Sequence, residues 1–265
     1  MAAHSNSNRY QVFKGSSDSI TLGTAVWRYM TFEKFFYLIE TSKLHHARLD
    51  QLGDPFEGSV TSAYAHAREI EVNPAQISSN RFEPWIHKSL LFRTYATCWH
   101  ASPDESDAQW KLYASGGAGV AIVSSLARLS EAVDIRPYRH GILGPVEYID
   151  FENHDMRLRP FGTRIRPGFA KRKSFEHEKE VRGVILLDPV NHGQTLEVNE
   201  ASLQRLRDER PVGILVRVNL KVLIQSIVIS PLARPYVEEL VRVITKRSSL
   251  YKLVRKSGLI GVPRY

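Results

Sequence analysis

Apolar residues recur along the chain in two rhythms, one typical of helices and the other of strands. Between residues 31 and 42 the spacing is i, i+3, i+4 and i+7, at Phe32, Phe35, Phe36 and Ile39. Residues 233–247 carry a second stripe of this kind, at Val237, Leu240, Val241 and Ile244. The spacing predicts an amphipathic helix in each segment.

Segments typical of strands are more numerous. β-branched and aromatic residues predict strands over residues 24–30, 91–102, 119–125, 143–151, 213–220 and 223–230. An acidic first turn predicts a helix between residues 102 and 115, which Gly116 and Gly117 end. Because strands outnumber helices and do not alternate regularly with them, we expect an α+β fold.

The segment from residue 171 to 187 reads KRKSFEHEKEVRGVILL and changes from charged to apolar. Its second half alternates in character, which predicts a strand. On a strand, Glu178, Glu180 and Arg182 point to one face and Lys179 points to the other. The two carboxylates are then roughly 6.5–7 Å apart.

Two carboxylates at this spacing have two interpretations. They can form a catalytic pair, in which one stabilises a developing cation and the other positions a nucleophile. In that case Arg182 and Lys173 keep both carboxylates ionised. Alternatively, they belong to a solvated strand start, where surface ion pairs contribute at most about 1 kcal/mol each. The residues alone leave both interpretations open.

Composition indicates an ordinary globular chain. With 265 residues and 43% hydrophobic residues, we expect one α+β domain over residues 21–265, preceded by a polar, loosely ordered segment over residues 1–20. The sequence has no apolar run of about 18 residues and no signal-peptide pattern, so we expect a cytoplasmic protein without membrane contact. The single cysteine, Cys98, excludes an intrachain disulfide and a multi-cysteine zinc site, and we expect no metal.

The net charge of +8 favours partners that carry phosphate. Basic residues are densest in segments 157–173 and 242–256, which leaves a nucleic-acid-binding protein or nuclease as an alternative to a solvated basic surface. The sequence lacks a phosphate loop, a GxGxxG after a strand, HExxH and GxSxG. A restriction-type nuclease needs a lysine two positions after an acid. Lys179 instead directly follows Glu178, which counts against that class.

Two short segments contain charged residues for which the sequence leaves two roles open. Arg28 lies in a short strand between aromatic residues, where it either binds a phosphate beside Tyr29 or pairs with an internal carboxylate. The turn-rich segment LGDPFEG contains Asp54 and Glu57. We expect Asp54 to cap the loop and Glu57 to pair with a basic residue, in a structural role or at the edge of a site.

Aromatic residues gather in the segment CWHASPDESDAQWKLY. Trp99 and His100 end a predicted strand, and Trp110 and Tyr113 share one face of the helix that follows. These rings either form a slot for a flat ligand or pack as an aromatic core.

In order and content these segments resemble the bacterial domain of unknown function 2971 family. The matching pieces are WRYMTFEKFFYLIETSKLHHARLDQLGDPFEG, CWHASPDESDAQWKLYASGGAGVAI, KRKSFEHEKEVR and the closing LVRKSGL, which together span most of residues 25–260. More remotely, the chain is similar to the ADP-ribosyltransferase superfamily. Arg28 matches the residue on the first strand, and Glu178 and Glu180 match a late [Glu/Gln]-x-Glu motif. CWHAS takes the place of a Ser-Thr-Ser motif, with Trp99, His100 and Ser102 as candidates.

The second resemblance implies a core of two small, mainly antiparallel β-sheets with flanking helices and NAD as a substrate between them. Arg28 would hold the pyrophosphate and Glu180 would stabilise the transition state as nicotinamide leaves. Glu178 would orient the acceptor, which is a protein, a nucleic acid or water. The implied ligand-binding residues are Arg28, Tyr29, Trp99, His100, Trp110, Tyr113, Lys173 and Arg182. The implied activity is NAD consumption, in a bacterial defence or toxin-like effector. A nucleotide-binding module without catalysis is the alternative.

Overall fold

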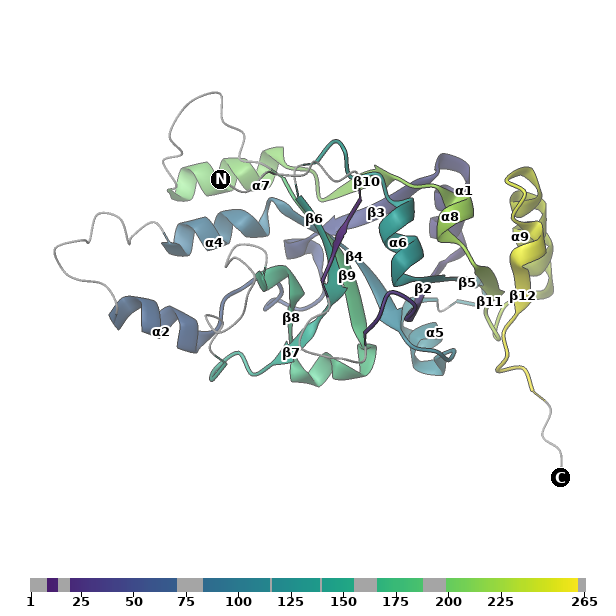
Figure 1. The fold of residues 1–265 in the computed structure, drawn as a ribbon, viewed down its shortest axis with the longest axis horizontal. Coiled ribbons are helices and arrows are strands. Elements are labelled where there is room, and N and C mark those ends of the chain that lie inside the picture. The colour runs from purple at the N-terminus through teal and green to yellow at the C-terminus, as the bar shows by residue number, and fades with distance from the viewer. Residues whose placement is uncertain are drawn as a thin grey trace.

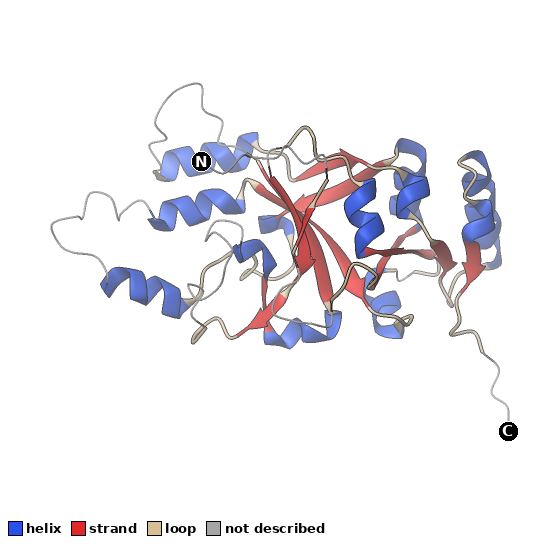
Figure 2. Ribbon diagram, in the orientation of Figure 1, coloured by secondary structure: helices blue, strands red, loops and turns tan. Residues whose placement is uncertain are grey.

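The structure is a computed structural model that describes residues 9–13, 20–70, 83–114, 116–138, 140–154, 166–187 and 199–261. Strands cross the middle of the molecule and helices lie around them (Figure 2). The fold is therefore α+β, as the sequence predicts.

The described elements follow in chain order. The strands are β1 (Gln11–Val12), β2 (Ala25–Thr31), β3 (Lys43–Arg48), β4 (Thr94–Ala101), β5 (Gly119–Ser125), β6 (His140–Pro145), β7 (Glu147–Ile149), β8 (Ala170–Arg172), β9 (Glu180–Leu186), β10 (Gly213–Arg217), β11 (Ser226–Ile229) and β12 (Val254–Lys256). The helices are α1 (Phe32–Thr41), α2 (Ser62–Ile70), α4 (Glu83–Leu91), α5 (Asp107–Tyr113), α6 (Leu126–Ala132), α7 (Glu200–Glu209), α8 (Leu220–Leu223) and α9 (Pro235–Arg247). Short 3₁₀ helices are η1 (Leu49–Gln51), η4 (Arg166–Phe169), η5 (Lys173–Glu178) and η6 (Tyr251–Leu253).

Ten of the described strands form one branched, mainly antiparallel sheet. Its main path runs β1-β6-β9-β4-β2-β5-β11-β12, and β3 carries β10 as a side branch. The exceptions to antiparallel pairing within this sheet are β1 with β6 and β11 with β12. β7 and β8 form a separate parallel pair. The expectation of two small sheets is corrected in this respect, because β4 joins both branches into one sheet.

The branch lies at β4, near the centre of the molecule (Figure 1). One edge of β4 pairs with β9 along its length. On its other edge, β3 pairs with the beginning of β4 through Ala96 and β2 pairs with the end through His100, so residues 97–99 pair with neither. α1 joins the two diverging strands, and Ser42 turns the chain from α1 into β3 in a left-handed conformation (φ 51°).

The main hydrophobic core lies on one face of the sheet. α1, α6, α8 and α9 pack there against the strands, with Phe35, Leu129, Leu223 and Val241 among the buried side chains. Each such side chain contributes about 1.5–3 kcal/mol when fully buried. On the other face, α5 packs on β2, and the regions around η1 and η4 pack on β4 and β9. The second face is thus covered in separate patches.

Some sequence expectations need correction. Residues 9–13 of the polar segment are ordered: β1 pairs with β6, and Tyr10 belongs to the main core. Phe36 and Leu240, expected on apolar helix faces, are 46% and 43% exposed. The predicted strand 213–220 ends at Arg217, and α8 follows it. Helices α6 and α7 were not predicted, and residues 1–8 and 14–19 lie outside the described residues.

Candidate functional site

A cavity of about 760 Å³ opens at the branch of the sheet, where β2 and β3 diverge from β4. This volume is typical of a site for a small molecule or cofactor. Most of the predicted site residues line it, namely Arg28, Tyr29, Trp99, His100, Tyr113, Glu178, Glu180 and Arg182. Trp110 and Lys173 are not among the lining residues.

Glu178 and Glu180 come together, but strand alternation is not the reason. β9 begins at Glu180, while Glu178 is the last residue of η5. Between them Lys179 has a φ of 42°, in the left-handed region, and its side chain is exposed. This turn lets both carboxylates reach one ammonium group: Lys171 Nζ lies 2.7 Å from Glu178 Oε2 and 3.2 Å from Glu180 Oε2.

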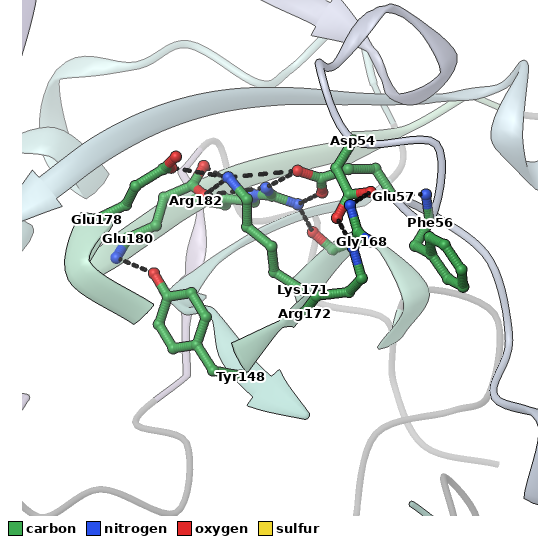
Figure 3. Close-up of polar contacts among 10 residues, drawn as sticks. All are labelled: Asp54, Phe56, Glu57, Tyr148, Gly168, Lys171, Arg172, Glu178, Glu180 and Arg182. Carbon is green, nitrogen blue, oxygen red and sulfur yellow. Dashed lines mark hydrogen bonds and ion pairs between the residues drawn. The ribbon is translucent and has the colours of Figure 1, made fainter. Parts of the chain in front are cut away.

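Arg182 is fully buried, and carboxylates bind both edges of its guanidinium (Figure 3). Nε and Nη2 donate to Glu180 at 2.8 and 3.0 Å. Nη1 and Nη2 donate to Glu57 at 2.6 and 2.9 Å, and Nη1 also donates to the carbonyl oxygen of Gly168 at 3.0 Å. These bonds engage every nitrogen of the guanidinium, so its planar fork fixes both glutamates relative to each other.

The buried charges around Arg182 and Lys171 form ion pairs with one another. Glu57, Glu178 and Glu180 supply three formal negative charges, and Lys171 and Arg182 supply two positive ones. The cluster therefore carries one net negative charge. Burial opposes ionisation of Glu180, but Arg182 and Lys171 outweigh it and lower the pKa of Glu180 to about 2. Burial likewise disfavours the Lys171 ammonium, but Glu180 and Glu178 outweigh it and raise the Lys171 pKa.

The LGDPFEG loop delivers Glu57 to this cluster. Asp54 accepts the backbone N–H of Phe56 at 3.1 Å and pairs with Arg172 at 2.9 Å. Gly58 has a φ of 76°, which favours glycine. The capping of the loop by Asp54 and the basic partner of Glu57 are both as the sequence predicts. Glu57 also lines the cavity, so the loop forms part of the site wall.

Lys171, rather than Lys173, neutralises the two carboxylates. Lys171 lies in β8 and is buried, whereas Lys173 begins η5 with an exposed side chain. The expectation for Lys173 is corrected because η5 turns the chain between Lys173 and Glu178. Tyr148 of β7 strengthens the arrangement, since its hydroxyl accepts the backbone N–H of Glu180 at 2.7 Å.

Arg28 lies in the opening where β2 and β3 diverge. Its guanidinium donates to the hydroxyl of Thr97 and to the carbonyl oxygen of His45, and it lies over the ring of Trp99 at 5.7 Å. Burial lowers the pKa of Arg28 below its ordinary value. The described part of the chain offers it no carboxylate partner. The internal ion pair that was one interpretation of Arg28 is therefore not observed there.

Some of the predicted aromatic site residues line the cavity, and others lie beneath its wall. Tyr29 and the partly exposed Tyr113 line the cavity. Trp110 lies under Tyr29 in an edge-to-face contact of 4.8 Å, and its indole N–H donates to Glu105 at 2.7 Å. Trp110 therefore supports the wall and does not line the cavity itself. Trp99 reaches the cavity but is otherwise part of the main core.

His100 lies between Tyr29 and Glu178. Its ring meets Tyr29 edge-on at 6.3 Å, and its Nδ1 lies 2.6 Å from the backbone carbonyl oxygen of Glu178. A carbonyl accepts only, so Nδ1 carries the proton. Burial lowers the pKa of His100, and the imidazole is neutral near pH 7.

Other lining residues were not predicted as site residues, among them Lys171, Gln109 and Cys98, and Glu57 was expected either in a structural role or at the edge of a site. Gln109 is 3% exposed, and its Nε2 has no hydrogen-bond partner within the described ranges. Burial and then Glu180 raise the pKa of Cys98, so it is a protonated thiol. Gln109 precedes the predicted Trp110, and Cys98 precedes Trp99. Their neighbours in sequence were the available signal.

The two basic segments form no second buried charged cluster among the described residues. Residues 157–165 of the first basic segment lie outside the described residues, and its described end contributes Lys171 to the buried cluster. In the second basic segment, Arg242 and Lys256 pair with Glu238. In the described part of the chain, no three His, Cys, Asp or Glu side chains are arranged so that they could hold a metal ion. No helix there combines the length and apolar character needed to cross a bilayer.

No family model matches this chain, and no curated protein or solved structure matches it. The site's own geometry therefore carries the functional argument.

Proposed function

We propose that the protein is an NAD-consuming enzyme of ADP-ribosyltransferase type, which transfers ADP-ribose to an acceptor or hydrolyses NAD. The observation that carries this proposal is the polarity of the cavity. Carboxylates line it on the β9 side of β4, whereas the β2 and β3 side is lined by cations to which the described residues give no carboxylate partner. NAD has the complementary polarity, with a cationic nicotinamide ring joined through ribose to a pyrophosphate.

The acidic side suits the reacting centre. Departure of nicotinamide leaves positive charge on the ribose ring, and a carboxylate beside that ring stabilises the developing cation. Glu178 and Glu180 are held beside the cavity by Lys171 and Arg182, with one net negative charge in the cluster. Because the carboxylates are already fixed, they need little reorganisation as the charge develops.

The basic side suits the pyrophosphate. Arg28, Lys34, Lys43 and His45 line it, and the described residues supply no ion-pair partner to these two lysines. Burial, then Arg28 and Lys34, lower the pKa of His45, as expected in cationic surroundings. Glu33 also lines this side, but it lies at the start of α1, where its own backbone N–H and Thr31 lower the pKa of its carboxyl. An anionic ligand would compensate these cations.

The walls between the two sides suit a flat ring that carries an amide. Tyr29 and Tyr113 line the cavity near His100, with Trp110 supporting Tyr29 from below. The unpartnered amide of Gln109 complements a carboxamide, because an amide both donates and accepts. Together these groups support nicotinamide as the leaving group.

Titration calorimetry with NAD, ADP-ribose and nicotinamide tests the proposal. We expect wild-type protein to bind NAD and ADP-ribose, and Arg28→Met to weaken binding of both by about tenfold or more. Arg242→Met, which removes an exposed arginine from α9, is the matched control and should bind like wild type. Equal binding by all three proteins, or no binding of NAD, would contradict the proposal.

A nucleotide-binding module without catalysis is a second candidate. The observation that favours it is the pairing of Glu180, whose two carboxylate oxygens both contact buried cations. Such a module binds NAD and leaves it intact, so measuring nicotinamide release separates the two candidates.

A further inference from the structure

Both carboxylate oxygens of Glu180 accept hydrogen bonds from buried cations. Oε1 accepts from Arg182 Nε at 2.8 Å, and Oε2 accepts from Lys171 Nζ at 3.2 Å and from Arg182 Nη2 at 3.0 Å. The residue is 5% exposed. A ligand hydroxyl that bonded Glu180 would therefore have to share an oxygen with a buried cation.

Glu178 has an oxygen to offer. Its Oε2 accepts from Lys171 Nζ at 2.7 Å, while Oε1 has no hydrogen-bond partner among the described residues. The side chain lines the cavity and is 11% exposed. Of the two carboxylates that the sequence singles out, Glu178 is therefore the one whose free oxygen can contact a ligand.

His100 has an unpartnered acceptor in the same cavity. The Nδ1–H donates to the backbone carbonyl of Glu178, which fixes the tautomer and leaves the Nε2 lone pair available. Nε2 has no partner among the described residues, although the side chain is 7% exposed and lines the cavity. Nε2 is not among the fully buried atoms that lack a partner, so it is accessible from the cavity, and a ligand that brings an O–H or N–H group could donate to it.

We propose that Glu178 and His100 are the catalytic residues that contact the substrate, and that Glu180 positions the cluster. The assignment rests on the proposed function. An acceptor O–H, from water or a hydroxyl group, attacks C1′ of the ribose. The bond from C1′ to the nicotinamide nitrogen breaks, and its electron pair neutralises the ring. The acceptor's proton passes to His100 Nε2, while the Glu178 carboxylate faces the positive charge on the ribose.

The surroundings of His100 determine its titration. Burial lowers its pKa most, and the hydrogen bond to the Glu178 carbonyl opposes this in part. Among the described residues, the charged and titratable groups that face it are Tyr29 from β2, Glu178 and Lys179 at the η5–β9 turn, and Glu180 from β9. The neutral base form therefore persists to a pH below the ordinary histidine value of about 6.5.

Nicotinamide release as a function of pH tests the assignment. In wild-type protein we expect kcat to fall as the pH drops through the pKa of His100, and His100→Gln to lower kcat by about 100-fold or more and to lose this acidic limb. Imidazole in solution should restore part of the activity of His100→Ala, which a purely structural role would not produce. His140→Gln, at an exposed histidine of β6, should keep the wild-type profile.

The two glutamates give the second comparison. Glu178→Gln should lower kcat by about 100-fold or more, and it should lower the thermal midpoint less than Glu180→Gln does, because among the described residues Glu178 pairs with Lys171 alone whereas Glu180 pairs with Lys171 and Arg182. The assignment is overturned if wild type releases nicotinamide while His100→Gln and Glu178→Gln keep its kcat and pH profile. A wild-type protein that releases none under any condition overturns the proposed function itself, and the assignment with it.

Discussion

Lys171 is the residue on which the acidic cluster depends. Its ammonium lies within 3.4 Å of an oxygen of Glu57, Glu178 and Glu180, and the side chain is 8% exposed. Without it, three buried carboxylates would face Arg182 alone. Breaking a buried ion pair by removing one partner is strongly destabilising, because the remaining charge is uncompensated.

We therefore expect Lys171→Met to lower the free energy of unfolding by about 3–5 kcal/mol. Lys173→Met, two positions away at an exposed lysine, should change it by no more than about 0.5 kcal/mol. Urea unfolding followed by circular dichroism measures both. Equal effects of the two substitutions would show that the cluster does not hold Lys171 as described.

His46 makes the stability of the fold depend on pH. The ring is fully buried in β3, with Nε2 2.5 Å from the hydroxyl of Tyr10 and Nδ1 3.1 Å from the carbonyl of Leu44. Burial lowers the pKa of His46 to about 3. The unfolded chain therefore binds more protons below about pH 6.5, so stability is complete above that pH and is lost as the pH falls toward 3.

Complete loss of the His46 contribution lowers the free energy of unfolding by about 5 kcal/mol. Urea midpoints measured between pH 7.5 and pH 5 should fall in wild-type protein, and His46→Gln should flatten this slope whatever its absolute stability. Glu180 adds its own loss only below about pH 4.5, so the two contributions separate by pH window. The same slope in both proteins would contradict the neutral, buried His46.

Single residues were predictable where their chemistry is local. Arg28, Glu178, Glu180 and Arg182 stand out because charges in apolar or alternating segments need partners. The pairing of Arg182 with Glu57 was not predictable, because the two residues are 125 positions apart and only the folded chain brings them together.

Among the elements, the η5–β9 turn shows which residues the alternation of side chains predicts correctly as a strand and which it does not. Alternation identifies residues 180–186 correctly as a strand, with Glu180 and Arg182 on the cavity face. The same pattern extended to Glu178 is wrong, because the left-handed residue Lys179 ends the strand geometry. Neither a lysine nor its neighbours indicate that conformation in advance, so the 3₁₀ helix could not be predicted.

The LGDPFEG loop can be tested with a matched pair of glycines. At Gly58 the φ is 76°, and a Cβ would lie 2.8 Å from Leu91 and 3.0 Å from Leu49. At Gly53 a Cβ would meet nothing within 4 Å. We expect Gly58→Ala to lower the free energy of unfolding by about 1–3 kcal/mol and Gly53→Ala to change it little.

Thermal unfolding of the two alanine variants measures this difference. Because Gly58 follows Glu57 directly, Gly58→Ala should also weaken NAD binding. A Gly58→Ala protein with wild-type stability would contradict the loop geometry.

At the scale of the whole molecule, the branch of the sheet creates the cavity. Residues 97–99 of β4 have no strand partner on one edge, and α1 spans the gap between β2 and β3. The sequence predicts the longer strands and the α+β class, since both follow from local patterns, but it does not predict β1, β8 or β12. It does not predict the branch, because strand order depends on pairings between distant segments.

The central claim is that this cavity binds NAD with the nicotinamide end at the carboxylates and cleaves it. The most direct test is nicotinamide release from NAD by purified protein, with water and with candidate protein and nucleic-acid acceptors, for wild type and Glu178→Gln. We expect wild-type protein to release nicotinamide, and the folded Glu178→Gln variant to release about 100-fold less. Equal release by the two proteins, or none by wild type with any acceptor, would contradict it.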